Sequence, residues 1–182
     1  MDTKTLCLGA LLLKDGSGYD IKKLFETTFS HFQNASLSSI YPSLVKLEKE
    51  GSVTYKIKSS NKNPDKKLFK LTKRGEKRFI DSLINTNPTE ILKSDFLVLL
   101  FFSHLIERNI LKKKLIEIED HFNSKLNFLN TVLLQEDLTP GMSFGVEQGI
   151  AVYSAKLKHL KKNKNLFLEK NEKVKKNANA KI

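Results

Sequence analysis

The hydrophobic repeat changes from about 3.6 residues to 2 directly after Gly51, and this change restricts the possible folds more than any other feature of the sequence. Before it, apolar residues recur at helical spacing in three consecutive segments. After it, Val53, Tyr55 and Ile57 alternate with polar residues, as in a half-buried strand. A second strand and a fourth helix follow. The predicted helices cover residues 5–13, 18–32, 37–50 and 72–83, and the hairpin has strands at 53–58 and 68–71 with a polar loop at 61–65.

Local signals mark the ends of these helices. Ser17 and Asp20 have the spacing of a capping box, in which the hydroxyl accepts from the third helical amide and the carboxylate accepts from the N-cap amide. Ser36 precedes the third helix as an N-cap, and Gly51 follows it as the favoured left-handed stop residue. With the hairpin behind them, the helices have the order of a winged helix-turn-helix. In that fold the third helix enters the DNA major groove, and the wing lies along the backbone or in the minor groove.

The second half of the chain has helical spacing almost throughout. Asn87, Pro88 and Glu90 have the pattern of a helix start, so we place a domain boundary between residues 87 and 88. Helices are expected near residues 90–108, 110–136 and 144–170, with the last dozen residues frayed. Four apolar residues extend beyond one helical stripe and predict contact with a second copy of the chain: Phe101, Phe102, Leu105 and Ile106.

The predicted fold class is mainly α with a small β-hairpin wing. A winged helix-turn-helix domain occupies residues 1–87, and an all-helical dimerisation domain with a basic C-terminal tail occupies residues 88–182. The net charge of +12 divides unevenly along the chain, with +7 in residues 1–87, −3 in 88–155 and +8 in 156–182. A positive excess at both ends is expected for a partner that is a polyanion, and double-stranded DNA fits the winged helix.

Candidate DNA contacts lie around the third helix and on the wing. Ser36, Ser38 and Ser39 lie at the N-terminal end of that helix, where free amides and the helix dipole favour a phosphate. Tyr41 could reach a phosphate or a thymine methyl, or pack against the second helix, and Tyr19 could contact the DNA backbone or pack in its turn. The third helix contains no arginine, the residue that most often contacts guanine. We therefore expect recognition to depend mainly on phosphate contacts, A·T-rich sequence and groove shape. The lysines that complete the set, each of which could instead be solvated, are Lys46 on the third helix and Lys62, Lys66 and Lys67 on the wing.

Several motifs in fixed order closely resemble the PadR family of bacterial transcriptional regulators. They lie at residues 8–12 (LGALL), 17–21 (SGYDI), 40–44 (IYPSL), 47–51 (LEKEG) and 68–75 (LFKLTKRG). The resemblance implies a homodimer joined by the helical C-terminal domain, which binds a partly palindromic operator. The segments NPDK and KSDF are similar to the subgroup that contains the quorum-linked virulence activator of vibrios. Some family members hold planar drugs between tryptophans at the dimer interface, and the absence of Trp here removes support for that mode.

No other chemistry has comparable support in the sequence. The four histidines are scattered, and neither HExxH nor CxxC occurs, so no catalysis, metal or other cofactor is expected. The longest apolar run, residues 96–102, is too short to span a membrane, and we expect a soluble cytoplasmic protein with no membrane partner. Cys7 is expected in the core, with an oxidation-sensing thiol as the alternative. Two alternatives stay open: a ligand- or redox-gated sensor form of the regulator with an unidentified small-molecule effector, and a non-DNA adaptor that uses the helical domain and the basic tail.

Overall fold

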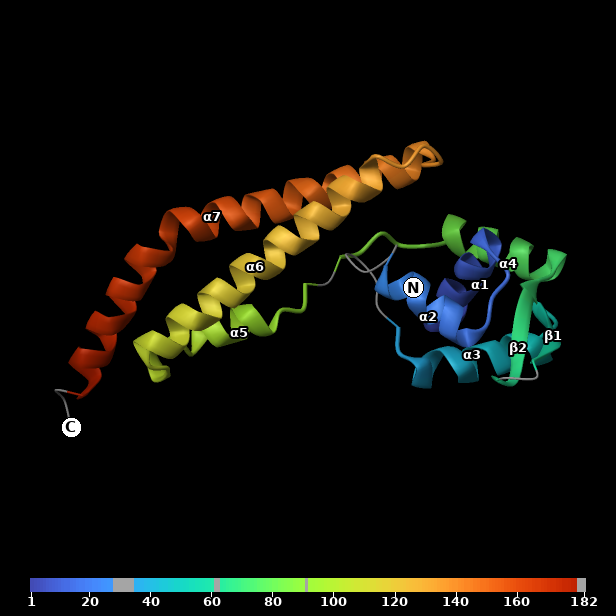
Figure 1. Ribbon diagram of the computed structural model, residues 1–182, viewed down its shortest axis with the longest axis horizontal. Coiled ribbons are helices and arrows are strands. Elements are labelled where there is room, and N and C mark those ends of the chain that lie inside the picture. The colour runs from blue at the N-terminus through green and yellow to red at the C-terminus, as the bar shows by residue number, and fades with distance from the viewer. Residues whose placement is uncertain (28–34, 61–62, 91, 180–182) are drawn as a thin grey trace. The chain divides into compact units, whose positions relative to one another are not determined.

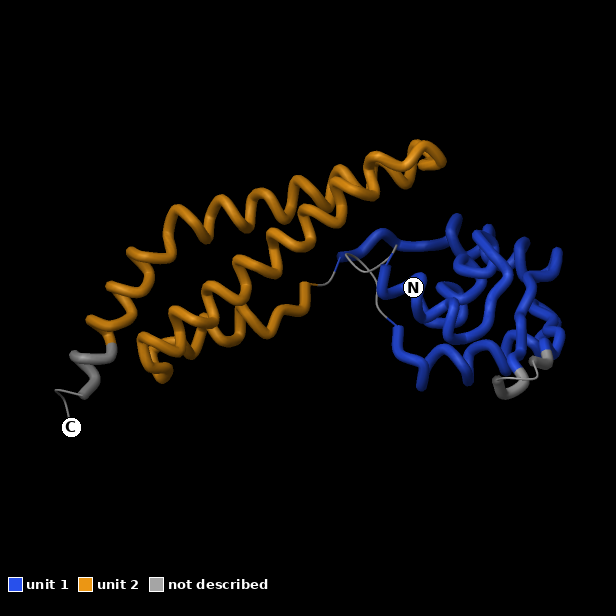
Figure 2. Tube along the Cα trace, in the orientation of Figure 1, with its two compact units in different colours: residues 1–90 blue, residues 91–182 orange. Residues whose placement is uncertain are grey.

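The structure is a computed structural model that describes residues 1–27, 35–60, 63–90 and 92–179 (Figure 1). The chain divides into two compact units, residues 1–90 and residues 91–182 (Figure 2). None of the helices in the described part of the chain is long and apolar enough to cross a membrane.

Unit 1 is a winged helix-turn-helix, with three helices, an antiparallel hairpin and a fourth helix in the predicted order (Figure 1). The second helix ends at Glu26, and the rest of its predicted span, residues 28–32, lies outside the described residues. Its elements are α1 (Thr3–Leu13), α2 (Gly18–Glu26), α3 (Leu37–Lys49), β1 (Val53–Ser60), β2 (Asn63–Leu71) and α4 (Lys73–Ile84).

Helix caps account for the short segments of unit 1. Ser17 Oγ accepts from the Asp20 amide at 3.2 Å, and the Asp20 carboxylate accepts from the Ser17 amide at 2.8 Å, which confirms the predicted capping box of α2. Gly51 has a φ of 68°, the left-handed conformation expected after the end of α3. Thr72 caps α4 by accepting from the Gly75 amide at 3.0 Å.

The hairpin is longer than the sequence predicts. Pairing begins at Val53 with Leu71 and continues as far as Ser60 with Asn63. The predicted loop at 61–65 is therefore wrong from Asn63 onward, because cross-strand hydrogen bonding extends the strands into this polar sequence. The other edge of β2 pairs with the α1–α2 turn, where the Gly16 amide donates to the Phe69 carbonyl at 3.1 Å and the Phe69 amide donates to the Gly16 carbonyl at 2.9 Å.

One apolar core joins these elements. Each of α1, α2, α3, β1 and β2 contributes at least one side chain that is almost completely buried, so the hairpin belongs to the same core as the helices. The largest of these side chains are Leu8, Phe25, Ile40, Leu44, Leu47 and Phe69.

Unit 2 is helical, as predicted. It contains α5 (Asp95–Phe101), a short 3-10 helix η1 (Ser103–Leu105), α6 (Arg108–Leu133) and α7 (Pro140–Asn179). The long helices α6 and α7 lie side by side as an antiparallel pair (Figure 1), with α5 and η1 at the end where α6 begins. Their core contains Leu111, Leu115, Phe122, Leu160 and Leu168.

Two expectations for the second half of the chain are wrong. Residues 87–90 are not helical, and the first helix begins only after Ser94, whose hydroxyl accepts from the Leu97 amide at 3.3 Å. The chain before Ser94 has a helix-start pattern, but its described residues, Leu92 among them, are mostly exposed, so no packing stabilises a helix there. The last dozen residues are expected to fray, yet α7 continues to Asn179. Packing holds it as far as Asn171, whose side-chain amide donates to the Ser103 carbonyl at 3.1 Å.

Candidate nucleic-acid interface

The outward face of α3 is exposed along its whole length. The opposite face buries Ile40, Leu44 and Leu47 in the core, as the helical spacing predicts. The exposed face carries hydroxyl, aromatic, aliphatic and amino groups in sequence from the N-terminal end to the C-terminal end. These residues are Ser38, Tyr41, Pro42, Val45, Lys46 and Lys49.

Three serines occupy the N-terminal end of α3 without capping it. Ser36 is the N-cap residue by position, but its hydroxyl forms no side-chain cap; it lies 2.7 Å from Ser38 Oγ and 3.3 Å from Ser39 Oγ. Ser39 Oγ donates to the Ser36 carbonyl at 2.8 Å. The first-turn amides consequently lack the side-chain acceptor that caps α2 and α4, and such amides together with the helix dipole favour an anion.

Tyr41 packs against the start of α2 and also faces outward. A Cβ atom at Gly18 would lie 2.8 Å from Cζ of Tyr41, so the absence of a side chain at Gly18 is what lets the ring lie there. The Tyr41 side chain nevertheless remains 45% exposed, and the adjacent Tyr19 is 59% exposed. The packing role that the sequence left open for Tyr41 is therefore observed, although almost half of the residue stays exposed. The requirement for glycine at position 18 was not predicted; the Gly–Tyr pair was visible in the sequence only as a motif.

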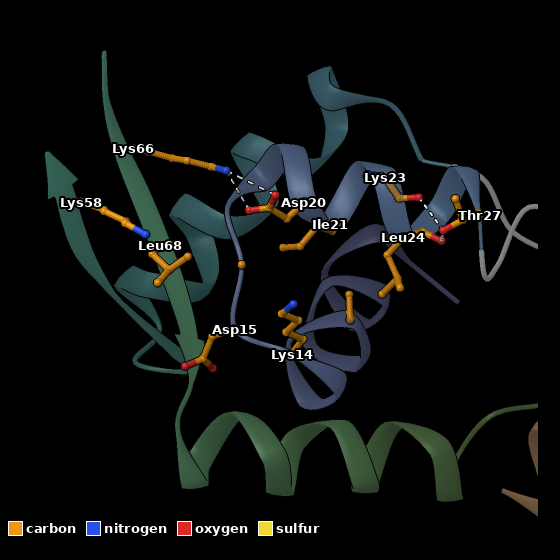
Figure 3. Close-up of a pocket in the computed structure, with 12 residues that line it drawn as sticks. Lys14, Asp15, Asp20, Ile21, Lys23, Leu24, Thr27, Lys58, Lys66 and Leu68 are labelled. Carbon is orange, nitrogen blue, oxygen red and sulfur yellow. Dashed lines mark hydrogen bonds and ion pairs between the residues drawn. The ribbon is translucent and has the colours of Figure 1, made fainter. Parts of the chain in front are cut away.

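The described wing lysines do not all project freely. Lys66 Nζ lies 3.0 Å from Asp20 Oδ2 (Figure 3), and Lys67 Nζ lies 4.2 Å from the centroid of the Tyr55 ring. Lys70 is paired more loosely with Asp15, at 3.9 Å. Lys46 on α3 is exposed, and Lys62 lies outside the described residues.

An open groove of about 830 Å³ lies between the wing and the first two helices (Figure 3). Its walls combine lysines, two carboxylates and aliphatic side chains, so it is basic overall. The groove is lined by Ala10, Lys14, Asp15, Gly16, Asp20, Ile21, Lys23, Leu24, Thr27, Lys58, Lys66 and Leu68. Sequence reasoning missed this juxtaposition because Asp20 and Lys66 are 46 positions apart in the chain.

Residues 7–81, which include most of the winged helix, match the transcriptional regulator PadR-like family. The Bacillus subtilis negative transcriptional regulator PadR is 34% identical over 106 residues, which are 58% of this chain and 58% of that protein. Residues 7–81 are a domain of the PadR-like family. This family consists of transcriptional regulators, and the resemblance to it that the sequence motifs indicate is confirmed.

Solved structures extend this likeness over both units. The Streptococcus mutans protein smu.1604c is 30% identical, covers 90% of this chain and 98% of its own, and has a TM-score of 0.81. The PadR-like regulator BC1756 from Bacillus cereus is 29% identical, covers 94% and 98%, and has a TM-score of 0.75. Bacillus subtilis PadR, solved with operator DNA, is 25% identical, covers 90% and 98%, and has a TM-score of 0.72. The Vibrio cholerae virulence activator AphA, at 15% identity and a TM-score of 0.56 over the whole chain, shares the fold alone.

The C-terminal unit of this PadR-like chain leaves an apolar surface on α5 and η1. Phe101 is 82% exposed, Leu105 is 70% exposed and Phe102 is also exposed. Ile106 differs from the other predicted interface residues, because it is half-buried and packs against the core of its own unit. Val98, which is not among the predicted interface residues, is also exposed on α5.

Cys7 lies in the core of the PadR-like domain rather than at a reactive site. Its side chain is fully buried, and burial raises the pKa of the thiol to about 12. The thiolate that oxidation requires is therefore strongly disfavoured in the folded protein. Among the residues that the structure describes, no three His, Cys, Asp or Glu side chains are grouped so that they could hold a metal ion.

Proposed function

We propose that this protein is a sequence-specific DNA-binding transcriptional regulator of the PadR type, acting as a homodimer on a partly palindromic operator. The observation that carries the proposal is the exposed, uncapped α3 beside a lysine-bearing hairpin in a PadR-like domain. Operator DNA in the structure of Bacillus subtilis PadR supports the same role for the matching unit here.

In this proposal α3 enters the major groove. A phosphate binds at the first turn, beside Ser36, Ser38 and Ser39, where the amides are not capped. Tyr41 and Val45 offer apolar edges to thymine methyl groups, a contact suited to A·T-rich sequence. Flanking contacts to the DNA backbone come from Tyr19 at the start of α2, Lys46 near the end of α3, and Lys62 and Lys67 on the wing.

Lysine contacts to phosphate make the affinity depend on salt. Each neutralised phosphate contributes about 0.9 to the slope of log affinity against log salt concentration. Lys67→Gln should therefore weaken binding to operator and to scrambled duplex about equally and reduce the slope by about one.

Fluorescence anisotropy on DNA from the gene's own promoter region, against scrambled duplex and across a salt series, tests the proposal. We expect the wild-type protein to prefer the promoter DNA near physiological salt. Lys158→Gln is the matched control, because it removes the same charge from an exposed position of α7. Equal, weak binding of the wild-type protein to both duplexes would contradict this function, and identical effects of the two substitutions would contradict the phosphate contact of Lys67.

The homodimer has its own support in the apolar surface of unit 2. Phe101, Phe102 and Leu105 are exposed on adjacent short elements, and Val98 extends the same helix. A contiguous apolar surface of this kind marks an interaction site. Two copies joined there would place two α3 helices on one DNA molecule, which a palindromic operator requires.

A ligand-gated form of the same regulator is the second candidate. Bacillus subtilis PadR has been solved with p-coumaric acid, at 25% identity to this chain. An effector of this protein should raise the melting temperature and release operator DNA at the same concentrations. A compound that stabilises the protein without changing DNA affinity would not be an effector.

A further inference from the structure

We propose that Asp20 is a positioning residue for the wing: it holds β2 against the start of α2 through Lys66 and so keeps the hairpin in the orientation that selects operator DNA. The inference rests on the proposed function, and it assigns Lys66 to wing attachment while Lys67 is left to contact phosphate.

Three contacts fasten β2 to the α1–α2 turn and the first turn of α2. The backbone groups of Gly16 and Phe69 exchange two hydrogen bonds. On either side of Phe69, Lys70 pairs with Asp15 at 3.9 Å and Lys66 pairs with Asp20 at 3.0 Å. Of the three contacts, the Lys66 pair lies nearest the tip of the hairpin along β2. It is therefore the contact that can fix the orientation of the outer half of the hairpin.

The Asp20 carboxylate is already oriented before Lys66 reaches it. Asp20 Oδ2 accepts from the Ser17 amide at 2.8 Å and from Ser17 Oγ at 2.7 Å, as part of the α2 capping box. These bonds restrict the rotamer of Asp20, so only the lysine loses side-chain freedom when the pair forms. A pre-oriented partner is what distinguishes this pair from an ordinary surface salt bridge.

The wing needs such a partner because its own lysines repel one another. Lys58 and Lys66 are directly opposite in the strand register, and Lys56 and Lys70 lie on the same face of the hairpin. Like charges directly opposite on two strands destabilise the pairing, and an isolated two-stranded hairpin is marginally stable at best. Asp20 supplies the opposite charge at the Lys58–Lys66 pair (Figure 3).

Substitutions at position 20 separate the pair from the cap. Gln and Glu are both accepted at the third position of a capping box, so Asp20→Gln keeps the cap but loses the charge, and Asp20→Glu keeps both. Glu26→Gln is the matched control, because Glu26 is also on α2 but pairs with Lys22, away from the wing. Lys66→Gln removes the other partner.

Two measurements on the full chain test whether Asp20 attaches the wing and whether this attachment affects DNA selection. Amide hydrogen exchange at Gly16 and Phe69 reports attachment without DNA, and the ratio of operator to scrambled-duplex affinity reports selection. Asp20→Gln and Lys66→Gln should each speed exchange and lower the affinity ratio by about threefold to fivefold, the upper range for an exposed ion pair. The double substitution should do no more than either single one. Loss of one negative charge acts on both duplexes alike, so Glu26→Gln should leave the ratio unchanged.

The outcomes separate this inference from the proposed function. If Asp20→Gln behaves as Asp20→Glu in both measurements, or if exchange rises while the affinity ratio stays constant, Asp20 does not position the wing for DNA selection. If the wild-type protein binds both duplexes equally, the proposed function fails instead. The exchange rates then decide whether Asp20 attaches the wing.

Discussion

Gly75 shows how closely single residues of the PadR-like domain are packed. A Cβ atom at this position would lie 2.0 Å from the carbonyl oxygen of Ser52 and 2.9 Å from Cδ1 of Leu71. The Ser52 carbonyl also accepts from the amide and the hydroxyl of Thr72, at 3.2 and 3.0 Å. The first turn of α4 therefore packs directly on the backbone before β1, which leaves no room for a side chain.

Substitution of Gly75 should destabilise the protein. Gly75→Ala forces the backbone apart at this contact, and we expect a loss of about 1–3 kcal/mol in the free energy of unfolding. Gly145→Ala is the control, because nothing lies within 4 Å of its added methyl group in α7; it should be neutral or stabilise by up to about 1 kcal/mol. Urea denaturation followed by circular dichroism measures both. Equal stabilities of the two variants would show that α4 can move away from Ser52 without cost.

At the scale of elements, the N-terminal end of α2 combines a helix cap with attachment of the wing. Hydrogen bonds from Ser17 to the Asp20 carboxylate, with a further contribution from Lys66, lower the pKa of Asp20 from 3.8 to about 2. The folded protein therefore binds this proton less tightly than the unfolded chain does. The resulting stabilisation is fully present above the unfolded pKa of 3.8 and is lost as the pH falls toward about 2.

The stability difference between the wild-type protein and Asp20→Gln should therefore depend on pH. We expect the wild-type advantage to be constant from pH 7 to 5 and to shrink between pH 4 and the acid limit of folding, because protonated Asp20 loses its charge-assisted bonds. Urea denaturation of both proteins at a series of pH values measures this difference, and groups common to both cancel. A difference that stays constant down to pH 3 would show that Asp20 has the same pKa in the folded and unfolded states, so that its contacts do not lower it.

At the scale of the whole molecule, each unit has its own core, and unit 2 leaves large apolar side chains exposed on two adjacent short helices. The cores contain residues of one unit each. On α5 and η1, Phe101 and Leu105 have most of their surface exposed. Exposed apolar side chains of this size are costly for a monomer in water, which is the physical reason to expect a second copy there.

Charges on this surface should dissociate the proposed dimer. Phe101→Glu combined with Leu105→Glu buries two unpaired carboxylates in the interface, and we expect the dimer dissociation constant to rise by about 100-fold or more. Sedimentation velocity at micromolar concentration measures the change. Leu134→Glu is the control, because Leu134 is 83% exposed at the end of α6, away from α5 and η1. A wild-type monomer, or a double variant that remains a dimer, would contradict an interface on this surface.

The sequence by itself determined the order of elements in unit 1, because short-range chemistry specifies them. The capping box of Ser17 and Asp20, the left-handed Gly51 and the alternation that begins at Val53 each act within a few residues. It also predicted that α3 and a basic hairpin would belong to the candidate site. The same local signals were misleading at Pro88, because the described residues that follow it, Leu92 among them, stay exposed and no packing supports a helix there.

Only the tertiary structure decided the features that depend on contacts between residues far apart in the chain. The bond from Asn171 to the Ser103 carbonyl fastens α7 at the point where its sequence looks frayed, and it joins residues 68 positions apart. The pairing of Lys66 with Asp20, 46 positions away in the chain, is likewise visible only in the folded structure, and it is the basis for the proposed attachment of the wing. Local hydrogen bonds and hydrophobic period can be read from neighbouring residues, whereas burial and charge pairing depend on which distant side chains the fold brings together.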